Sequence, residues 1–402
     1  MSLPDRGHLF PHLAVVRELV NRGNRVTFVT APSMTDLVAA SGARMLPYES
    51  HYEGIDDKVG VANDDGGSGM MTLGVAECAS MLRAIESDFG DDRPDLVVYD
   101  FAVSPGGRVL ERKWGLPAIQ VYPVFAQNEH YSFADSLMET AEERHAGDEP
   151  PDLDDWMSSP EMREWVRAVE DLLAAHGVDT DFQELMLPVQ DLTMVYVPRE
   201  FQPYGETFDE RFEFVGPCMQ DRTFLGTWEP PKTDLPVVLV SMGTVFNELP
   251  DFFRTAVRAF TGAPLHVVMT VGGGFDPADL GPLPDNIEVH RWVSHLGVLE
   301  HARAFVTHAG MSSVTDALSA GCPVVAVPVS PMERSTGRRV AQLGIGRLLL
   351  PDALDAGSLR ETVLEVVADE ATHKNAAEMR AHTAAAGGTG RAADVIENRR
   401  GH

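Results

Sequence analysis

The stretch FVTHAGMSSVTD, residues 305–316, holds the residue types that most directly suggest chemistry. An apolar run ends at His308, and Gly310, Ser312 and Ser313 then open an amphipathic segment that continues as VTDALSAG. A helix that begins there leaves backbone N–H groups without partners and turns the positive end of its dipole toward any ligand in front of it. Such a helix start is a ready anion site, and the imidazole can add a further donor to a phosphate.

Three other features add nucleotide-binding chemistry to this junction. Asp316 follows about one turn into the helix, where its carboxylate can accept hydrogen bonds from two ribose hydroxyls. The segment SMGT, residues 241–244, ends another apolar run and offers Gly243 and Thr244 in the same way. Trp292 ends EVHRW, and its flat indole can stack on a base. Each feature alone is also typical of a helix cap or a core residue, but together they favour a nucleotide ligand.

These residues lie at junctions between strand-like and helix-like segments that alternate along the chain. PHLAVVRELVN (11–21) has helical apolar spacing, RVTFVT (25–30) is β-branched, and DLVVYD (95–100) has the pattern of a buried parallel strand. The alternation resumes at VVLVSMGT (237–244). Strands that alternate with helices predict parallel, doubly wound α/β sheets, whose ligands lie at the carboxyl ends of the strands.

The 402 residues are enough for two domains. Pro and Gly crowd together in GPCMQDRTFLGTWEPPKTDLP, which predicts an interdomain linker. The boundaries that we expect are 1–217 for the first domain with a helical, acidic insertion at about 126–187, 218–236 for the linker, 237–380 for the second domain, and 381–402 for a C-terminal helix.

Composition excludes several function classes. The chain has 32 basic and 61 acidic residues and a net charge of −29, which disfavours binding to nucleic acid or to anionic membranes. No apolar run is long enough to predict a membrane span, and residues 1–13 do not resemble a signal peptide. The three cysteines are far apart, so neither a disulfide framework nor a zinc site is expected, and a cytoplasmic location is the default.

The motifs taken together resemble a known family. GHLFPHLAVVRELVNRGNRVTFVT, DDRPDLVVYD, SMGT, LPDNIEVHRWV, FVTHAG, TDALSAGCPVVAVP and LGIGR match the macrolide-type bacterial branch of the family 1 glycosyltransferases, over nearly the whole chain. The resemblance implies the GT-B fold, in which two Rossmann-like domains face each other across a cleft. It also implies that the first domain binds the acceptor, that the second binds a nucleotide-sugar donor, and that the last helix packs back on the first domain.

The resemblance assigns roles on the donor side. It implies that Trp292 stacks on the base, that Asp316 holds the ribose, and that His308 and the helix start at 310–313 bind the diphosphate. The donor-binding residues that we expect are Gly243, Thr244, Trp292, Val293, His308, Gly310, Ser312, Ser313, Asp316, Met332 and Glu333.

On the acceptor side, inverting transfer needs a base that takes a proton from the attacking hydroxyl. A His is the natural base, and the family's GHxxP motif places His8 in a loop that opens the first helix. Asp100 ends DLVVYD, where its carboxylate can orient the imidazole and stabilise the imidazolium. His12, four residues on, is the rival base.

The resemblance implies no metal, because a helix end and His308 can carry the charge of the leaving diphosphate. Metal-dependent transferases of another fold use an Asp-x-Asp spacing, which occurs here at 152–154 and 179–181. In so acidic a chain we interpret both as solvated loops.

Two departures from the family pattern concern the donor. WVSH replaces the usual WxPQ, so His295 stands where a Gln often helps to hold the ribose, and either His295 substitutes for it or affinity falls. Met332 and Glu333 stand where the family commonly has an acidic residue followed by Gln, which grip sugar hydroxyls. Since Met makes no useful hydrogen bond, we expect a deoxysugar, and an amino substituent that pairs with Glu333 is one option.

A third departure concerns the start of the sheet. Only six residues precede Gly7, where the family has an apolar first strand in the centre of the sheet. MSLPDR cannot supply this strand, so either the true start lies upstream or the sheet lacks a central strand. Loss of the strand would weaken the positioning of His8.

The sequence therefore predicts an inverting, metal-independent transferase that moves a hexose, with a deoxyhexose favoured, from a UDP- or TDP-sugar to a hydroxyl of an apolar natural product such as a macrolide or polyketide aglycone. No cofactor is expected besides this co-substrate, and the oligomeric state stays open, with a homodimer as one option. The alternative is a catalytically impaired auxiliary homologue that binds nucleotide or a partner transferase. The altered WVSH and PMERS segments favour the alternative, whereas His8, Asp100, His308 and Asp316 favour the enzyme.

Overall fold

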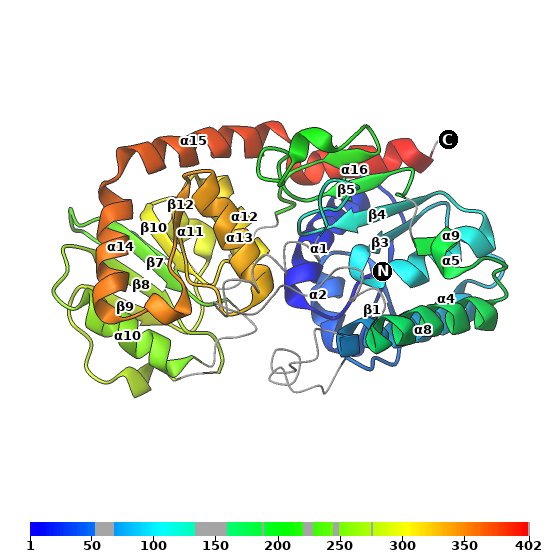
Figure 1. Ribbon diagram of the computed structural model, residues 1–402, viewed down its shortest axis with the longest axis horizontal. Coiled ribbons are helices and arrows are strands. Elements are labelled where there is room, and N and C mark those ends of the chain that lie inside the picture. The colour runs from blue at the N-terminus through cyan, green and yellow to red at the C-terminus, as the bar shows by residue number, and fades with distance from the viewer. Residues whose placement is uncertain are drawn as a thin grey trace. The chain divides into compact units, whose positions relative to one another are not determined.

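Helices and strands alternate along the chain, and every strand of the sheets is parallel to its neighbours (Figure 1). The computed structural model describes residues 1–52, 68–132, 159–186, 189–219, 228–243, 249–274 and 276–400. These residues separate into two units. Unit 1 holds the described residues up to 219 and those from 386 onward, and unit 2 holds those from 228 to 385.

Unit 2 contains one continuous six-stranded sheet with the strand order β12-β11-β10-β7-β8-β9. The strands are β7 (Val237–Ser241), β8 (His266–Thr270), β9 (Ile287–His290), β10 (Ala302–Thr307), β11 (Val324–Ala326) and β12 (Gly346–Leu348). The helices are α10 (Pro250–Phe260), α11 (His295–Leu299), α12 (Met311–Ala320), α13 (Pro331–Gln342), α14 (Ala356–Ala368) and α15 (Glu370–Ala385), with 3-10 turns η5 (Pro277–Leu280) and η6 (Pro351–Ala353).

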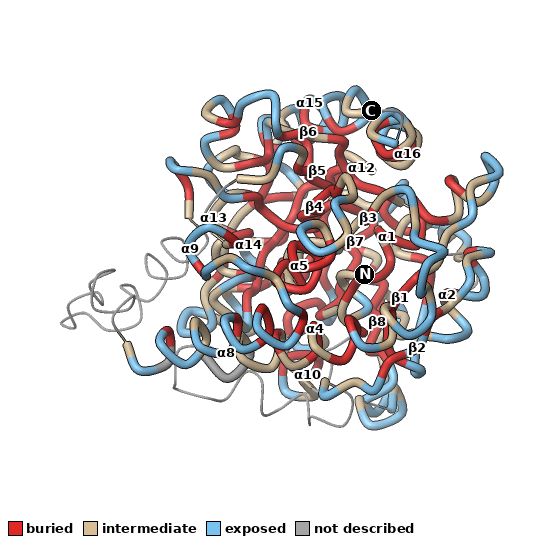
Figure 2. The backbone as a smooth tube through the Cα atoms, turned by 90° about the vertical axis from the view of Figure 1, so that its right-hand side faces the viewer, coloured by how far each residue is buried: buried red, intermediate tan, exposed pale blue. Residues whose placement is uncertain are grey.

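The core of unit 2 explains why these segments are strands. Val238, Leu239 and Val240 of β7 are all fully buried, which is the continuous apolar pattern of a strand covered on both faces. Phe253 and Phe260 of α10 pack into the same core cluster. Figure 2 shows the strands as largely buried backbone, whereas helices such as α8 keep an exposed side.

Unit 1 contains two separate sheets, a four-stranded sheet with the order β3-β4-β5-β6 and a pair β1-β2. The strands are β1 (Thr27–Thr30), β2 (Arg44–Pro47), β3 (Val97–Asp100), β4 (Ala118–Tyr122), β5 (Thr193–Val195) and β6 (Phe212–Phe214). The helices are α1 (Arg6–Asn21), α2 (Thr35–Ala40), α4 (Ser68–Phe89), α5 (Ser104–Trp114), α8 (Pro160–His176), α9 (Phe182–Met186) and α16 (Gly388–Arg400), with 3-10 turns η1 (Pro32–Met34), η2 (Phe101–Val103) and η3 (Gly205–Thr207).

Met1 and Ser2 lie between the two sheets of unit 1. The amino group of Met1 donates to the carbonyl of Val98 at 2.9 Å, and the N–H of Asp100 donates to the carbonyl of Met1 at 3.0 Å. On the other side, the N–H of Ser2 donates to Val29 at 3.3 Å. Met1 and Ser2 thus hydrogen-bond to both β1 and β3 without forming a strand of their own, and, as expected, the described residues of MSLPDR supply no central strand.

The last helix belongs to unit 1. The chain leaves α15 through Gly387 and Gly388, both with positive φ, and the N–H of Gly388 donates to Val215 at 2.6 Å. Apolar residues of α16, including Ile396, share a core cluster with α1, and Arg22 pairs with Asp394 at 2.6 Å. Among the described residues no helix is long and apolar enough to cross a membrane.

Parts of the expected segments lie outside the described residues. They include residues 133–158 of the predicted insertion at 126–187 and residues 220–227 of the predicted linker, whereas α8 and α9 fall within the insertion and are helical. Of the Asp-x-Asp pairs, 152–154 is outside as well, whereas Asp181 accepts a hydrogen bond from the N–H of Glu184 at the start of α9. In the described part of the chain, no group of three His, Cys, Asp or Glu residues is arranged to hold a metal ion.

Candidate active site

The side chains of His8 and Asp100 meet in unit 1. Nδ1 of His8 lies 2.9 Å from Oδ2 of Asp100, which is the last residue of β3. The position expected for His8, in a loop before the helix, is wrong. Asp5 caps α1 by accepting the N–H groups of Gly7 and His8, so the helix already begins at Arg6 and carries the imidazole in its first turn.

A second imidazole shares the same carboxylate oxygen. Nε2 of His12 lies 2.8 Å from Oδ2 of Asp100, and the hydroxyl of Tyr196 lies 3.4 Å from Nδ1 of His12. The side chain of His12 is 7% exposed and that of His8 is 21% exposed, so His8 is the ring that a substrate can reach. The i, i+4 spacing placed both rings on one helix face, and this is the sequence signal for the shared partner.

The protonation of this cluster follows from burial and from charge. Burial would raise the pKa of Asp100, but the charges and hydrogen bonds of His8 and His12 hold it well below its usual range. Burial would lower the pKa of His8, but the charge and hydrogen bond of Asp100 prevail and raise it to about 9. For His12 burial prevails and the pKa is lowered. The cluster therefore holds an ionised carboxylate, a protonated His8 and a neutral His12 at neutral pH.

In unit 2 the expected donor-binding residues follow the carboxyl ends of neighbouring strands. Thr307 of β10, Ser241 of β7, Thr270 of β8 and His290 of β9 are paired in one row across the sheet. The residues that come next in each strand therefore leave the sheet at the same edge, where open α/β sheets bind their ligands.

His308 packs directly over two glycines at this edge. A Cβ atom at Gly243 would lie 2.5 Å from Cε1 of His308, and one at Gly310 would lie 2.4 Å from Nε2. Only glycine permits this approach. Nδ1 of His308 lies 3.1 Å from the Thr307 hydroxyl, and burial lowers the pKa of His308 to about 4, so the ring is neutral at pH 7.

Helix α12 begins immediately after this histidine. Its N-cap, Gly310, has no side chain to occupy the first turn. Ala309 before it is fully buried and has φ +67°, a costly conformation for a residue other than glycine, which is often found where a site requires a sharp turn. Ser313 and Asp316 are 9% and 2% exposed, so Ser312 is the most accessible of the expected side chains in α12.

The expected residues that follow β9 differ in how far they are exposed. Trp292 is 37% exposed and keeps indole surface open for stacking. Val293 is 3% exposed, so its side chain offers little surface to a donor, and its expected role stays a prediction. His295 also turns inward, because its Nε2 lies 3.0 Å from the Thr270 hydroxyl and its ring packs edge-on against Phe305.

Glu333 has a structural role that the sequence analysis missed. Its Oε2 accepts the N–H groups of Val329 and Ser330, and the Ser330 hydroxyl accepts the N–H of Glu333, which is the capping box of α13. The S-x-x-E spacing of residues 330–333 was the available signal. Burial raises the pKa of Glu333 to about 7, and Oε1 lies 3.7 Å from Nε2 of His308. Met332 is 45% exposed, and Thr244 lies outside the described residues.

Comparison with known proteins extends this picture. Residues 264–397 match a family described as erythromycin biosynthesis protein CIII-like, C-terminal domain. Demethyllactenocin mycarosyltransferase of Streptomyces fradiae is 37% identical over 98% of this chain and 84% of its own length. Oleandomycin glycosyltransferase of Streptomyces antibioticus is 35% identical over 98% of this chain and 89% of its own length.

A solved structure agrees with these relatives. The crystal structure of CalG4, the calicheamicin glycosyltransferase, superposes with a TM-score of 0.87 at 40% sequence identity. It covers 100% of this chain and 97% of CalG4.

Proposed function

Since this chain belongs to the macrolide-type branch of the family 1 glycosyltransferases, sugar-transferring enzymes of the GT-B fold, we propose that it transfers a hexose with inversion from a UDP- or TDP-sugar to a hydroxyl of an apolar natural product. The observation that carries the proposal is the partly exposed His8, whose Nδ1 is held by the buried Asp100.

The acceptor half of the reaction rests on this pair. With Nδ1 of His8 bonded to Asp100, Nε2 is the nitrogen that takes the proton of the acceptor hydroxyl, and it does so in the fraction of molecules whose His8 is unprotonated. The acceptor oxygen forms a bond to the anomeric carbon as the bond to the diphosphate oxygen breaks, and that electron pair leaves with the nucleoside diphosphate. Asp100 stabilises the imidazolium, and His12 positions Asp100 through their hydrogen bond.

The donor half rests on the sheet edge of unit 2. The start of α12 offers backbone N–H groups and the positive end of a helix dipole to the diphosphate. His308, neutral before binding, is packed beside this start and can donate a hydrogen bond or take up a proton as charge develops. Trp292 supplies a surface for the base. The hydrogen-bond donors at the start of α12 and on His308 can stabilise the leaving diphosphate without a metal ion.

The sugar itself is proposed from Met332. An exposed thioether side chain at the start of α13 offers no hydrogen bond to a hydroxyl, which favours a deoxyhexose. Glu333 contributes through Oε1, since Oε2 is already used to cap the helix. An apolar aglycone as acceptor is proposed by analogy with the relatives, which are named after such products.

The first test separates donor binding from turnover. Thermal unfolding is measured with UDP, TDP, GDP and ADP, where a ligand at 100 times its dissociation constant adds about 2.7 kcal/mol. Turnover of UDP-glucose and of a TDP-deoxyhexose is then followed with a macrolide aglycone. A shift with UDP or TDP and product formation that His8→Ala abolishes support the proposal. Nucleotide binding without turnover of any donor would instead favour an auxiliary role.

A further inference from the structure

The imidazole of His8 has an aromatic neighbour as well as Asp100. Its face lies against the ring of Phe101, with 5.8 Å between the ring centroids and 28° between the ring planes. Phe101 in turn lies face to face with Tyr122, at 4.9 Å and 13°. His8, Phe101 and Tyr122 thus form an aromatic stack that runs from α1 through η2 to β4.

Phe101 reaches this position because it follows Asp100 in the chain. Asp100 ends β3, and Phe101 is the first residue of η2. Oδ1 of Asp100 accepts the N–H of Ala102 at 2.8 Å, which fixes the turn, while Oδ2 holds Nδ1 of His8. One short turn therefore brings a carboxylate and an aromatic ring to the same imidazole.

The far end of the aromatic stack is anchored in the interior of unit 1. Tyr122 is 7% exposed, and its hydroxyl accepts a hydrogen bond from Nε2 of Gln120 at 3.3 Å. Phe101 is half-buried, and the side chain of His8 is 21% exposed. The ring that a substrate can reach therefore rests on rings that the packed interior holds in place.

The aromatic stack supplies a restraint that the hydrogen bond to Asp100 lacks. A hydrogen bond at Nδ1 fixes that atom but lets the ring of His8 tilt about it, and Nε2 on the far side of the ring then moves the most. A ring against the face of the imidazole opposes this tilt, because tilting would separate the two faces or bring their atoms into overlap. Proton transfer is efficient only while the accepting atom stays within hydrogen-bond reach of the proton.

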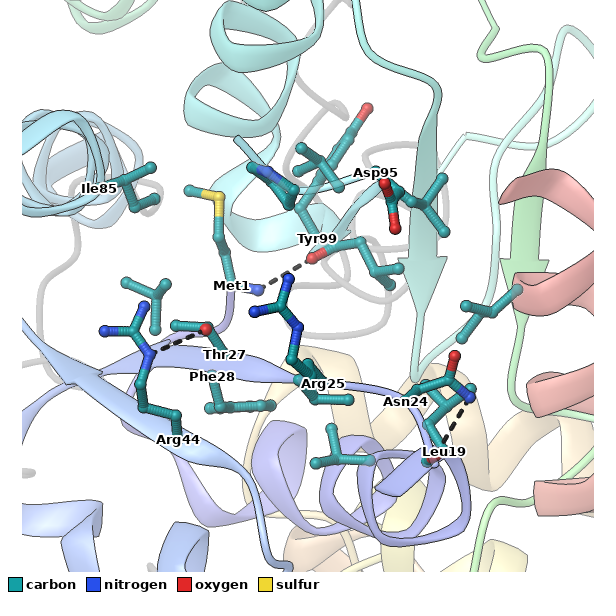
Figure 3. A pocket seen from close by; sticks show the side chains of 18 of the residues that line it. Met1, Leu19, Asn24, Arg25, Thr27, Phe28, Arg44, Ile85, Asp95 and Tyr99 are labelled. Carbon is teal, nitrogen blue, oxygen red and sulfur yellow. Dashed lines mark hydrogen bonds between the residues drawn. The ribbon is translucent and has the colours of Figure 1, made fainter. Parts of the chain in front are cut away.

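The aromatic stack also acts on the charge of the imidazole. The face of a phenyl ring is negative and attracts a cation that lies within about 6 Å of its centroid. Around His8, the charges of Asp100 and Asp5 favour the imidazolium, and burial opposes it. Further titratable groups near this cluster are largely neutral at pH 7: His12, whose pKa burial lowers, Tyr122 and Tyr196, whose pKa values burial raises, and the amino group of Met1 beside β3 (Figure 3), whose pKa burial lowers to about 6.

We propose that Phe101 is a positioning residue for the base of the transfer reaction, which holds the plane of the His8 ring so that Nε2 faces the acceptor hydroxyl and presents its π face to the imidazolium that forms. The proposal rests on the role of His8 under the proposed function. Phe101 itself takes no proton and forms no bond to the donor, so its effect passes through the imidazole.

The test compares Phe101→Leu, which keeps an apolar side chain but removes the aromatic face, with Phe101→Tyr, which keeps that face. Phe89→Leu is the matched control, because Phe89 is likewise a half-buried phenylalanine of unit 1, with Trp114 at 6.3 Å and the Arg44 guanidinium at 5.5 Å from its ring. The protonation of His8 is followed by NMR titration of its ring resonances, which are assigned by their loss in His8→Gln. Initial rates with a TDP-deoxyhexose and a macrolide aglycone give kcat and KM over the same pH range.

In Phe101→Leu we expect the titration midpoint of His8 to fall by about half a pH unit, the size of a partly exposed cation–π contact. On the plateau at high pH, kcat should fall about tenfold because Nε2 is less well placed, while KM for donor and acceptor changes less than about twofold. Phe101→Tyr should restore both the midpoint and kcat, and Phe89→Leu should change neither.

An unchanged titration midpoint in Phe101→Leu, or a loss that Phe101→Tyr does not restore, would overturn the proposal. A raised KM for the acceptor with kcat unchanged would overturn it as well, because Phe101 would then be a contact for the acceptor. The NMR titration does not require sugar transfer. Failure of the proposed function, seen as absence of turnover in the parent chain, is therefore distinct from failure of this proposal, seen as an unmoved midpoint.

Discussion

The two units place their polar groups in opposite ways. Unit 2 has a continuous sheet, and its candidate site consists mainly of backbone at the strand ends, with His308 kept neutral by burial. Unit 1 has a divided sheet, and its candidate site is a fully buried carboxylate, Asp100, shared by two imidazoles.

The contrast has an energetic consequence. A site made of several backbone donors loses only a little binding free energy when one side chain changes, because each hydrogen bond contributes about 0.5–1.5 kcal/mol. A buried charge that loses its partner costs several kcal/mol at once. We therefore expect changes in unit 1 to act on kcat in large steps and changes in unit 2 to act on donor affinity in small ones.

The largest effect is expected for His8→Ala. Without the imidazole the attacking hydroxyl loses its proposed proton acceptor, and kcat should fall by about 10³-fold, within the usual range for a general base. The dissociation constant of UDP or TDP, measured by calorimetry, should change less than about twofold, since His8 belongs to unit 1. A comparable loss of nucleotide affinity would contradict the division of roles between the units.

The pH dependence tests the same site. Because Asp100 raises the pKa of His8 to about 9, most His8 is protonated at pH 7 and cannot accept another proton. The value of kcat/KM should therefore rise about tenfold per pH unit between 7 and 9 and level off above. In Asp100→Asn the raising charge is gone and burial lowers the pKa of His8, so the rising limb moves to lower pH while the plateau falls. A rising limb that stays in place would mean that another group is titrated.

Asp316→Asn gives an intermediate effect. If the carboxylate holds the ribose, the isosteric amide loses a charge-assisted hydrogen bond of about 1.5–3 kcal/mol, and nucleotide affinity falls about 10- to 100-fold. Because Asp316 is 2% exposed, a purely structural role is the competing explanation. A lower thermal midpoint with unchanged nucleotide affinity would support that structural role.

Local chemistry explains what the sequence could predict. The alternation of apolar runs and helix patterns predicted parallel sheets in both halves, and two residues at strand and helix ends, His8 and Asp100, were predicted to meet. Parallel strands bring their carboxyl ends to one edge, so residues far apart in sequence could be assigned to one site.

Features that depend on tertiary packing could not be predicted from patterns in the sequence. The i, i+4 spacing puts His8 and His12 on one helix face, but their bond to the same oxygen of Asp100 depends on the position of β3 relative to α1. The inward turn of His295 likewise follows from its contacts with Thr270 of β8 and Phe305 of β10 rather than from the residues next to it in sequence. Glu333 differs, because the S-x-x-E spacing of its capping box is visible in the sequence, although the sequence analysis interpreted Glu333 as a sugar contact.

A smaller effect is expected for Gly310→Ala. The added Cβ would lie 2.4 Å from Nε2 of His308, so the ring must move away from the start of α12. The φ of Gly310 is −57°, which alanine adopts without strain, so the change acts through the ring alone. Nucleoside diphosphate affinity should fall about tenfold. Gly297→Ala is the matched control, because its Cβ meets no atom closer than 4.0 Å, and equal losses in both variants would contradict a role for His308.

The smallest effect is expected for Glu333→Gln, which separates the cap from a sugar contact. Glutamine preserves the capping box, so α13 should remain stable. Burial raises the pKa of Glu333 from an ordinary 4.5 to about 7, so its ionisation costs stability as pH rises through this window. The variant should match the parent in thermal stability at pH 4.5 and exceed it slightly at pH 8. If Oε1 pairs with an amino group of the sugar, kcat/KM for an aminodeoxy donor falls while that for a neutral donor changes less than about twofold. Equal values for both donors would leave Glu333 with its structural role alone.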